Sequence, residues 1–167
     1  MVGLAAVSRP ITVVTFRPEL AAAFAELNRA WIEEFFRLEA ADAKLLDDPG
    51  RAIVDPGGQV FFAIEGDHAV GTAAAIRVSP TTYELGKMAV RPSHQGQGLG
   101  ERLGRAVIDY ARAQGATCLY LETNSRLANA IRLYQRLGFA HSTPPHPSDY
   151  ARADVYMEVR FDRKGAA

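Results

Sequence analysis

Apolar and polar positions recur along the chain with two different periods, and each period predicts one kind of element. Between residues 18 and 36, apolar side chains return every three or four positions, which is typical of a helix with one face against a core. The stripe consists of Leu20, Phe24, Leu27, Trp31 and Phe35. We therefore expect a strand over 11–16, a helix over 18–36 that has Pro18 in its first turn, and a shorter helix over 39–46.

The middle of the chain predicts antiparallel strands. Three apolar-rich runs cover residues 60–65, 69–78 and 82–90, and only the short polar breaks 66–68 and 79–81 separate them. Breaks of this length and composition favour turns between antiparallel neighbours. The pattern therefore indicates a meander of three strands.

The second half of the chain alternates helices with strands. A helix over 101–114 ends near Gly115, a residue suited to stopping a helix, and strands are expected over 119–123 and 152–161. The apolar side chains on one side of this helix region are Leu99, Leu103, Val107, Tyr110 and Ala111. A meander followed by strands that helices separate predicts an α/β fold, a mixed sheet with helices on both faces.

Composition restricts the class of protein further. The 167 residues suit one domain, expected over 10–162 with flexible ends at 1–9 and 163–167. Nineteen basic and nineteen acidic residues give no net charge, which argues against nucleic acid or an anionic membrane as a partner. The lone Cys118 excludes an internal disulfide. Without an apolar run near the roughly 20 residues that span a bilayer, or a signal-peptide pattern, we expect a cytoplasmic protein.

A glycine-rich loop between the strand over 82–90 and the next helix is the strongest chemical feature. Residues 95–100 read QGQGLG. Few side chains let the backbone approach a ligand, and the unpaired N–H groups at a helix start bind anions. A Walker loop would need Lys-Ser or Lys-Thr where Glu101 and Arg102 stand, and the G-x-G-x-x-G spacing also fails. The pattern that fits is Q-x-x-G-x-G, over Gln95, Gly98 and Gly100.

A second segment lies downstream. Asn124, followed by residues 129–139 (NAIRLYQRLGF), is close to N-x-x-A-x-x-L-Y-x-x-x-G-F in its second half. With both segments, the chain resembles the GCN5-related N-acetyltransferase (GNAT) family over about 11–161. The resemblance implies a largely antiparallel seven-stranded sheet, splayed between its fourth and fifth strands, and acetyl transfer from acetyl-CoA to a primary amine of a small molecule, amino acid or peptide. The alternative is a noncatalytic acetyl-CoA sensor or interaction domain.

The resemblance also implies which residues bind the coenzyme. They are Met88, Ala89, Val90, Gln95, Gly96, Gln97, Gly98, Leu99, Gly100, Asn124, Asn129 and Tyr134. Main-chain groups at 88–90 would stabilise the oxyanion. Asn124 has a second interpretation as a helix cap, and Arg102 and Arg105 are candidates for the 3′-phosphate. His141 and His146 have no third ligand at useful spacing, so no metal is expected.

Two side chains are the candidates for proton transfer. Glu84 lies four residues before Met88, the offset at which histone-acetylating members of the family carry their general base. An amine of pKa about 10 must lose a proton before it attacks. Glu84 has the alternative of an ordinary strand residue or ion-pair partner, with water as the base. Tyr134 would donate to the coenzyme thiolate, or would be part of the core.

The acceptor remains open. Seven acidic against three basic residues between Glu26 and Asp48, Glu33 among them, would attract a cationic amine. In the loop before the last strand, Tyr150 and Arg152 are further candidates, and an arginine there could hold a substrate carboxylate. The first hint favours a polyamine, an aminoglycoside or a lysine side chain, and the second an amino acid or peptide. A homodimer also stays open.

Overall fold

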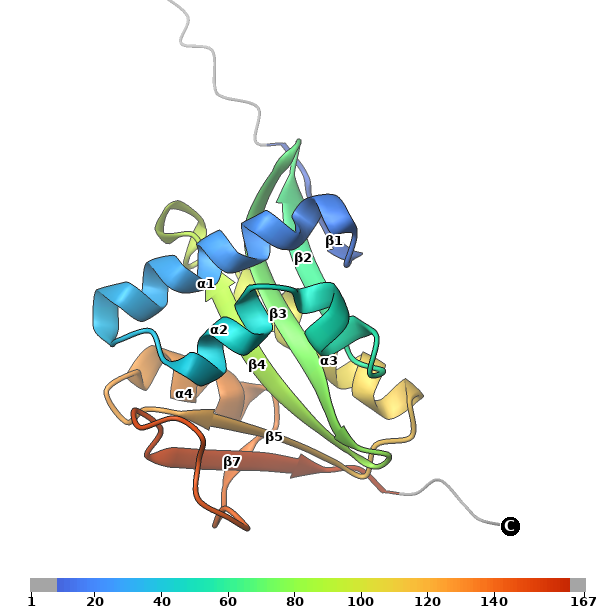
Figure 1. The fold of residues 1–167 in the computed structure, drawn as a ribbon, viewed down its shortest axis with the longest axis vertical. Coiled ribbons are helices and arrows are strands. Elements are labelled where there is room, and N and C mark those ends of the chain that lie inside the picture. Colours follow the sequence, from blue (N-terminus) through green and yellow to red (C-terminus); the bar gives the residue numbers. More distant parts are fainter. Residues whose placement is uncertain (1–8, 163–167) are drawn as a thin grey trace, which may run out of the picture.

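Alternating apolar positions assemble into one mixed sheet in the computed structural model, which describes residues 9–162 (Figure 1). The strands are β1 (Ile11–Thr15), β2 (Gln59–Glu65), β3 (His68–Ser79), β4 (Thr82–Val90), β5 (Cys118–Thr123), β6 (Ala140–His141) and β7 (Val155–Arg160). Their order in the sheet is β1-β2-β3-β4-β5-β7-β6. All neighbours are antiparallel except β4 and β5. The expected flexible ends fall outside the described residues, apart from Arg9.

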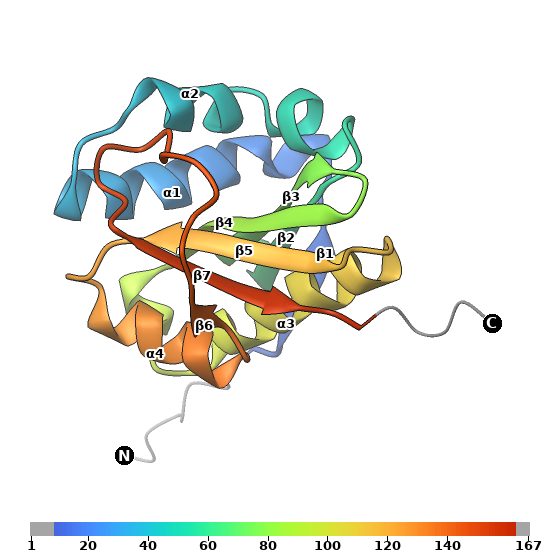
Figure 2. The same ribbon diagram turned by 90° about the horizontal axis from the view of Figure 1, so that it is seen from below.

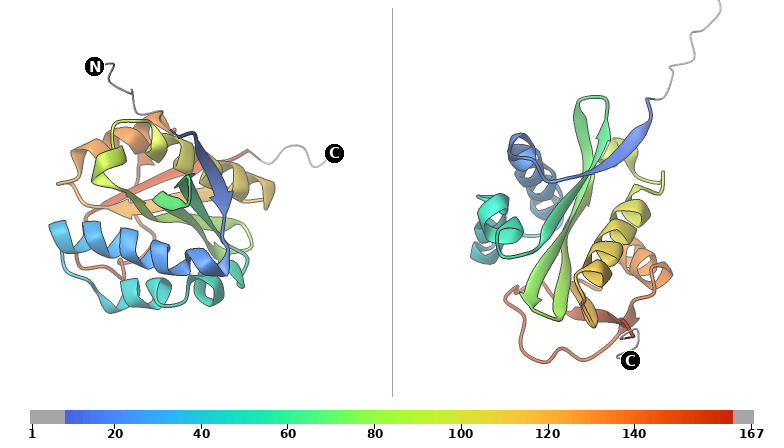
Figure 3. Two further views of the ribbon diagram at one scale, coloured as in Figure 1. Left: turned by 90° about the horizontal axis from the view of Figure 1, so that it is seen from above. Right: turned by 90° about the vertical axis from the view of Figure 1, so that its right-hand side faces the viewer.

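Helices cover both faces of this sheet, as the sequence predicts. They are α1 (Ala21–Phe35), α2 (Ala40–Leu46), α3 (Leu99–Ala113) and α4 (Ala128–Arg136), with short 3-10 turns at Pro18–Leu20 and Pro92–His94 and a π-helical turn at Gly50–Val54. The edge-on view places α1 and α2 on one side of the sheet and α3 and α4 on the other (Figure 3). The fold class is thereby confirmed.

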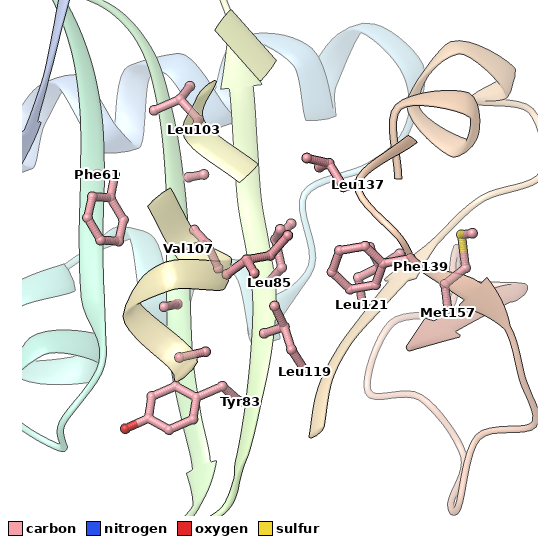
Figure 4. Packing of buried hydrophobic residues seen from close by; sticks show 14 of the residues in the cluster. Phe61, Tyr83, Leu85, Leu103, Val107, Leu119, Leu121, Leu137, Phe139 and Met157 are labelled. Carbon is pink, nitrogen blue, oxygen red and sulfur yellow. The ribbon is translucent and has the colours of Figure 1, made fainter. Parts of the chain in front are cut away.

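Successive residues of β2 show how one strand supports both layers. Side chains alternate along a strand, so Phe61 packs edge-on against Tyr110 of α3 while Phe62 packs edge-on against Phe24 of α1. The α3 side continues across the whole sheet as one apolar cluster, with Leu103 and Val107 above β4 and Phe139 and Met157 beyond β5 (Figure 4). A single core layer therefore connects the two halves of the sheet.

Two glycines of α3 allow this helix to lie against α4. A Cβ built at Gly100 would lie 2.9 Å from Leu133 Cδ2, and one at Gly104 would lie 2.5 Å from Leu137 Cδ1. Real Cβ atoms do not approach other atoms so closely, so a larger residue at either position would force these leucine side chains to shift. Gly100 thus makes room for Leu133 of α4 as well as belonging to the predicted loop.

The sheet opens between β4 and β5. Their parallel pairing covers only Thr82 with Cys118, Tyr83 with Leu119, and Glu84 with Tyr120. Beyond Glu84 the two strands separate, and residues 85–90 keep strand partners on the β3 side alone. The predicted splay is confirmed, and it leaves one edge of β4 free to bind a ligand.

A bulge bends β4 inside this opening. Thr72 faces Ala89 and Ala74 faces Gly86, so Lys87 and Met88 together face the single residue Ala73. Lys87 takes a φ of +50°, the sole positive φ at a non-glycine position among residues 9–162. A long side chain in this conformation is uncommon and persists where its surroundings hold it. The bulge therefore marks β4 as a place where tertiary contacts fix the backbone.

Four sequence expectations need correction. Phe35 is 45% exposed because the helical phase gives its place in the core to Ile32, which is fully buried. The predicted helix over 18–36 begins as a 3-10 turn and ends at Phe35, and the helix after the glycine loop starts at Leu99. The last strand starts at Val155, because residues 151–152 form a turn.

Candidate active site

A cavity of about 680 Å³ lies between the glycine loop, the end of β4 and α4; we call it the loop cavity. Gly96 and Gly98 line it with φ of +77° and +76°, left-handed values that favour glycine. No atom lies within 4 Å of where a Cβ would stand at either residue, so the space beside them is open. Gly98 precedes α3 without a side-chain cap, which leaves the first N–H groups of the helix available to an anion.

Exposed arginines surround the loop cavity, and the sequence analysis missed them. Arg126, Arg132 and Arg136 line it from the α4 side. The arginines that were expected there are bound elsewhere: Arg102 donates to the Ile11 carbonyl at 2.9 Å, and Arg105 pairs with Glu101 at 2.8 Å. A signal for the α4 set was present, because Asn129, Arg132 and Arg136 follow the spacing of one helix face.

A second cavity, of about 220 Å³, fills the opening between β4 and β5; we call it the sheet cavity. Its apolar wall comes from Trp31, Phe36, Leu45 and Ile76. Its polar lining comes from Glu84, Lys87, Glu122, Asn124, Tyr150 and Arg152. Met88, Ala89, Val90, Gln95 and Tyr134 line both cavities, so the two spaces meet at the free edge of β4.

Glu84 faces the sheet cavity in a setting that favours its protonated form. Its side chain accepts a hydrogen bond from the Tyr120 hydroxyl at 3.5 Å. Burial, and then the negative charge of Glu122, raise the pKa of Glu84 to about 7, although Lys87 and the Tyr120 hydrogen bond act in the opposite direction. A carboxylate with a pKa near neutrality is suited to accept and release a proton.

Tyr134 lies where the cavities meet. Its ring packs edge-on against Phe139, with the ring centroids 6.2 Å apart. Burial raises the pKa of its phenol to about 12. The phenol therefore remains protonated at neutral pH. Because its hydroxyl has no hydrogen-bond partner within residues 9–162, it is free to donate to a ligand.

A buried ion network supports the floor of the sheet cavity. Asp42 of α2 binds Lys87 Nζ at 2.6 Å, and both terminal nitrogens of Arg152 bind the Asp42 carboxylate at 2.6 and 2.8 Å. Burial raises the pKa of Asp42, but the hydrogen bonds from Arg152 and Lys87 outweigh it and hold this pKa at about 2. Burial lowers the pKa of Lys87, against the effect of Asp42. Sequence reasoning gave Asp42 no role beyond the acidic excess.

Tyr150 completes this network. Lys87 Nζ and Arg152 Cζ each lie 4.6 Å from the centre of its ring, and Lys87 also donates to its hydroxyl at 3.2 Å. The segment between β6 and β7 crosses to the α1 and α2 side of the sheet, which brings Tyr150 and Arg152 to Asp42 (Figure 2). Both predicted residues therefore line the cavity, with the Arg152 guanidinium already bound to carboxylates.

The remaining predicted site residues divide between the cavities and the surface. Asn124 donates to the Arg152 carbonyl at 2.7 Å and accepts from the Arg126 N–H at 2.9 Å. Leu127 rather than Asn124 stands at the start of α4, so the capping alternative is wrong. Asn129 lines the loop cavity and accepts a hydrogen bond from Arg132. Gln97 and Glu33 are exposed and line neither cavity.

Residues 9–162 show neither a metal-binding cluster nor a membrane-spanning helix. No three His, Cys, Asp or Glu side chains in this range come together as a metal site would require. The helices of this range are also too short or too polar to cross a membrane.

Comparison with known proteins identifies the family. The model of the acetyltransferase (GNAT) family matches residues 20–139. The chain is 33% identical to the N-acetyltransferase YvbK of Bacillus subtilis (strain 168) over 104 residues, which are 60% of this chain and 67% of that protein. The chain therefore belongs to the GNAT family and is an acetyltransferase, as the two sequence motifs predict.

Solved structures share this fold. A GNAT acetyltransferase from Staphylococcus aureus Mu50 superposes with a TM-score of 0.82 at 20% identity, over 90% of this chain and 99% of that one. The protein yncA from Salmonella typhimurium, whose structure was solved with its cofactor acetyl-CoA, gives a TM-score of 0.73 at 25% identity, over 95% of this chain and 98% of that one.

Proposed function

We propose that the protein transfers an acetyl group from acetyl-CoA, held in the loop cavity, to a primary amine that enters the sheet cavity. The observation that carries this proposal is the meeting of the two cavities at Met88 and Tyr134. One cavity has the features of a phosphate site, and the other presents a carboxylate of raised pKa. Two substrates bound from opposite sides would touch at this junction.

The loop cavity fits the coenzyme chemically. Its uncapped helix start and surrounding arginines suit a pyrophosphate, and yncA was solved with acetyl-CoA. The free edge of β4 offers main-chain groups to the amides of the pantetheine arm. When bound, acetyl-CoA supplies a thioester carbonyl as the electrophile and a thiolate as the leaving group.

Glu84 is the base in this proposal. It accepts a proton from the incoming ammonium, directly or through one water molecule. The gap between a pKa of about 10 for a free alkylamine and about 7 for Glu84 corresponds to about 4 kcal/mol. Desolvation of the ammonium in the sheet cavity narrows this gap, since burial lowers the pKa of an amine.

Tyr134 and the β4 backbone handle the negative charges that develop. Those main-chain N–H groups of residues 88–90 that point away from β3 would stabilise the oxygen of the attacked carbonyl. The Tyr134 hydroxyl would donate a hydrogen bond to the departing sulfur. Because its pKa is about 12, complete proton transfer to a thiolate requires a desolvated sulfur, and the hydrogen bond alone already stabilises the charge.

Release of free thiol from acetyl-CoA across a panel of primary amines tests this function, alongside a titration of coenzyme A by calorimetry. We expect micromolar to submillimolar coenzyme binding and thiol release that depends on the amine. Binding of coenzyme A with no thiol release for any amine would favour the noncatalytic sensor instead.

A further inference from the structure

The charges that line the sheet cavity restrict the amine that it accepts. Four of the lining side chains are carboxylates or strong bases: Glu84, Lys87, Glu122 and Arg152. The two cations are already in use. Lys87 binds Asp42 and the Tyr150 hydroxyl, and Arg152 binds Asp42 through both terminal nitrogens and Glu39 at 3.1 Å.

The two carboxylates that line the cavity are not paired in this way. Glu84 accepts from the Tyr120 hydroxyl, and Glu122 Oε2 accepts from the Ser148 hydroxyl at 2.8 Å. Both donors are neutral, and neither carboxylate has a cationic group within salt-bridge distance among residues 9–162. The charges of Asp42 and Glu39 balance those of Lys87 and Arg152. Glu84 and Glu122 therefore carry the excess of negative charge in the cavity.

The two carboxylates share one face of the sheet. Glu84 is directly opposite Tyr120 in the register of β4 and β5, and Glu122 follows Tyr120 by two residues. Residues two apart on a strand point to the same face. The strands separate beyond this pair, so the space between the carboxylates is the opening itself. Two ionised carboxylates in one cavity repel each other unless cations join them.

Glu122 lies near a second opening of this space, because together with Tyr120 it also lines a third cavity of about 270 Å³ under Pro144, Pro145 and His146. Trp31, Phe36, Leu45 and Ile76 supply the apolar part of the sheet cavity's lining. The cavity thus presents two acidic groups and an apolar wall.

We infer that the acceptor is an aliphatic amine with a second ammonium group and no carboxylate, placed so that the attacking nitrogen meets Glu84 and the second nitrogen meets Glu122. The inference rests on the proposed function and gives its substrate class. The two ammonium groups match the two carboxylates, and the methylene chain matches the apolar part of the lining. A substrate carboxylate would find both lining cations already bound to Asp42, and Glu122 would repel it.

Three compounds with the same four-carbon chain test this inference. Putrescine carries a second ammonium on its fourth carbon, butylamine carries a hydrogen in its place, and in 4-aminobutanoate the fourth carbon is a carboxylate. We expect kcat/KM for putrescine to exceed that for butylamine about tenfold or more, since a hydrogen bond between two charged groups is worth this much. We expect 4-aminobutanoate to fall below butylamine.

The variant Glu122→Gln assigns the effect to one side chain. It should reduce kcat/KM for putrescine to about the value for butylamine in the same variant. Both amines use the same base, so any change that the variant causes in the pKa of Glu84 cancels in this ratio. Glu34→Gln, at an exposed position of α1 outside the cavities, is the matched control and should change neither. Calorimetric titration of putrescine into the coenzyme-free protein gives a second readout, in which Glu122→Gln weakens binding by a similar factor.

Equal kcat/KM for putrescine and butylamine, a preference for 4-aminobutanoate, or an equal loss for all amines in Glu122→Gln would overturn the inference. Thiol release with monoamines but not with putrescine would also overturn this inference, although it would support the proposed function. Absence of release with every amine would instead overturn the proposed function, and putrescine binding that depends on Glu122 would still support the second ammonium site.

Discussion

The loop cavity and the sheet cavity are built in opposite ways. The loop cavity consists mainly of backbone and exposed side chains from two continuous segments, the glycine loop and α4. The sheet cavity draws mostly half-buried side chains from α1, α2, β3, β4, β5 and the segment before β7. The first is a local product of sequence and the second a product of the whole fold. Binding of a donor shared by many acetyltransferases can rest on a short motif, whereas selection of an acceptor needs distant residues.

Their electrostatics differ as well. Arg126, Arg132 and Arg136 surround the loop cavity, which suits a polyanionic coenzyme. Glu84 and Glu122 give the sheet cavity an excess of negative charge, which suits a cation. Charge alone therefore directs the two proposed substrates to different sides of Tyr134.

Asp42 connects the two sides of the opening that the sheet cavity fills. Lys87 belongs to β4, and Arg152 lies three residues before β7, the partner of β5. One buried carboxylate therefore ties both sides of the splay to α2. We interpret this network as the feature that fixes the width of the sheet cavity and holds the Lys87 bulge.

The largest expected effect comes from removing that carboxylate. Asp42→Ala leaves two buried cations without their shared partner, and we expect unfolding free energy to fall by about 3–5 kcal/mol in denaturant melts. Asp47→Ala, which breaks the exposed pair with Arg29 at 3.1 Å, is the control and should cost at most about 1 kcal/mol. Equal losses in the two variants would show that the network has no special part in the fold.

Replacement of the proposed base comes next. Glu84→Gln should lower kcat about a hundredfold or more with coenzyme affinity unchanged, because general-base catalysis contributes this much. In the unaltered protein, kcat/KM should rise with pH and level off above about 7, as Glu84 loses its proton. A steady-state pH profile measures both. If Glu84→Gln keeps the same rate and the same profile, water rather than Glu84 is the base.

Tyr134→Phe should have a smaller effect at the junction of the cavities. Without the hydroxyl the departing thiolate loses a donor, so we expect turnover to fall at least about tenfold while coenzyme A binding changes little. Phenylalanine retains the packing against Phe139. A change confined to coenzyme affinity would make Tyr134 a binding or core residue and remove it from the mechanism.

The smallest effect concerns the loop cavity. Arg132→Gln and Arg136→Gln should each weaken coenzyme A binding by up to about fivefold at low salt, and less at high salt, because exposed charges are screened. Arg112→Gln, at the far end of α3 from the glycine loop, serves as the control. Calorimetry at two ionic strengths measures the difference. An effect that is independent of salt would contradict a charge-based role.

The sequence predicts the elements around the loop cavity well, because the signals for them are local. The Q-x-x-G-x-G loop, the stop of α3 near Gly115 and the apolar side of α3 all depend on spacing within one segment. The sequence prediction is wrong at Phe35. The apolar pattern allows either Phe35 or Ile32 on the buried face of the helix, and the packing of the folded protein buries Ile32. The two-residue β6 is too short to give any period.

By itself, the sequence determined the family, the mixed sheet with its splay, and the residues that stand nearest the coenzyme motif. The tertiary structure decided that Lys87 and Arg152 both pair with Asp42, 45 and 110 residues away, and that Glu122 shares a cavity with Glu84. Periodicity reports which face of an element is buried, but the charge that a cavity leaves unpaired depends on contacts between elements distant in the chain. For this reason the motifs identify the acetyl donor, and only the folded arrangement bears on the amine.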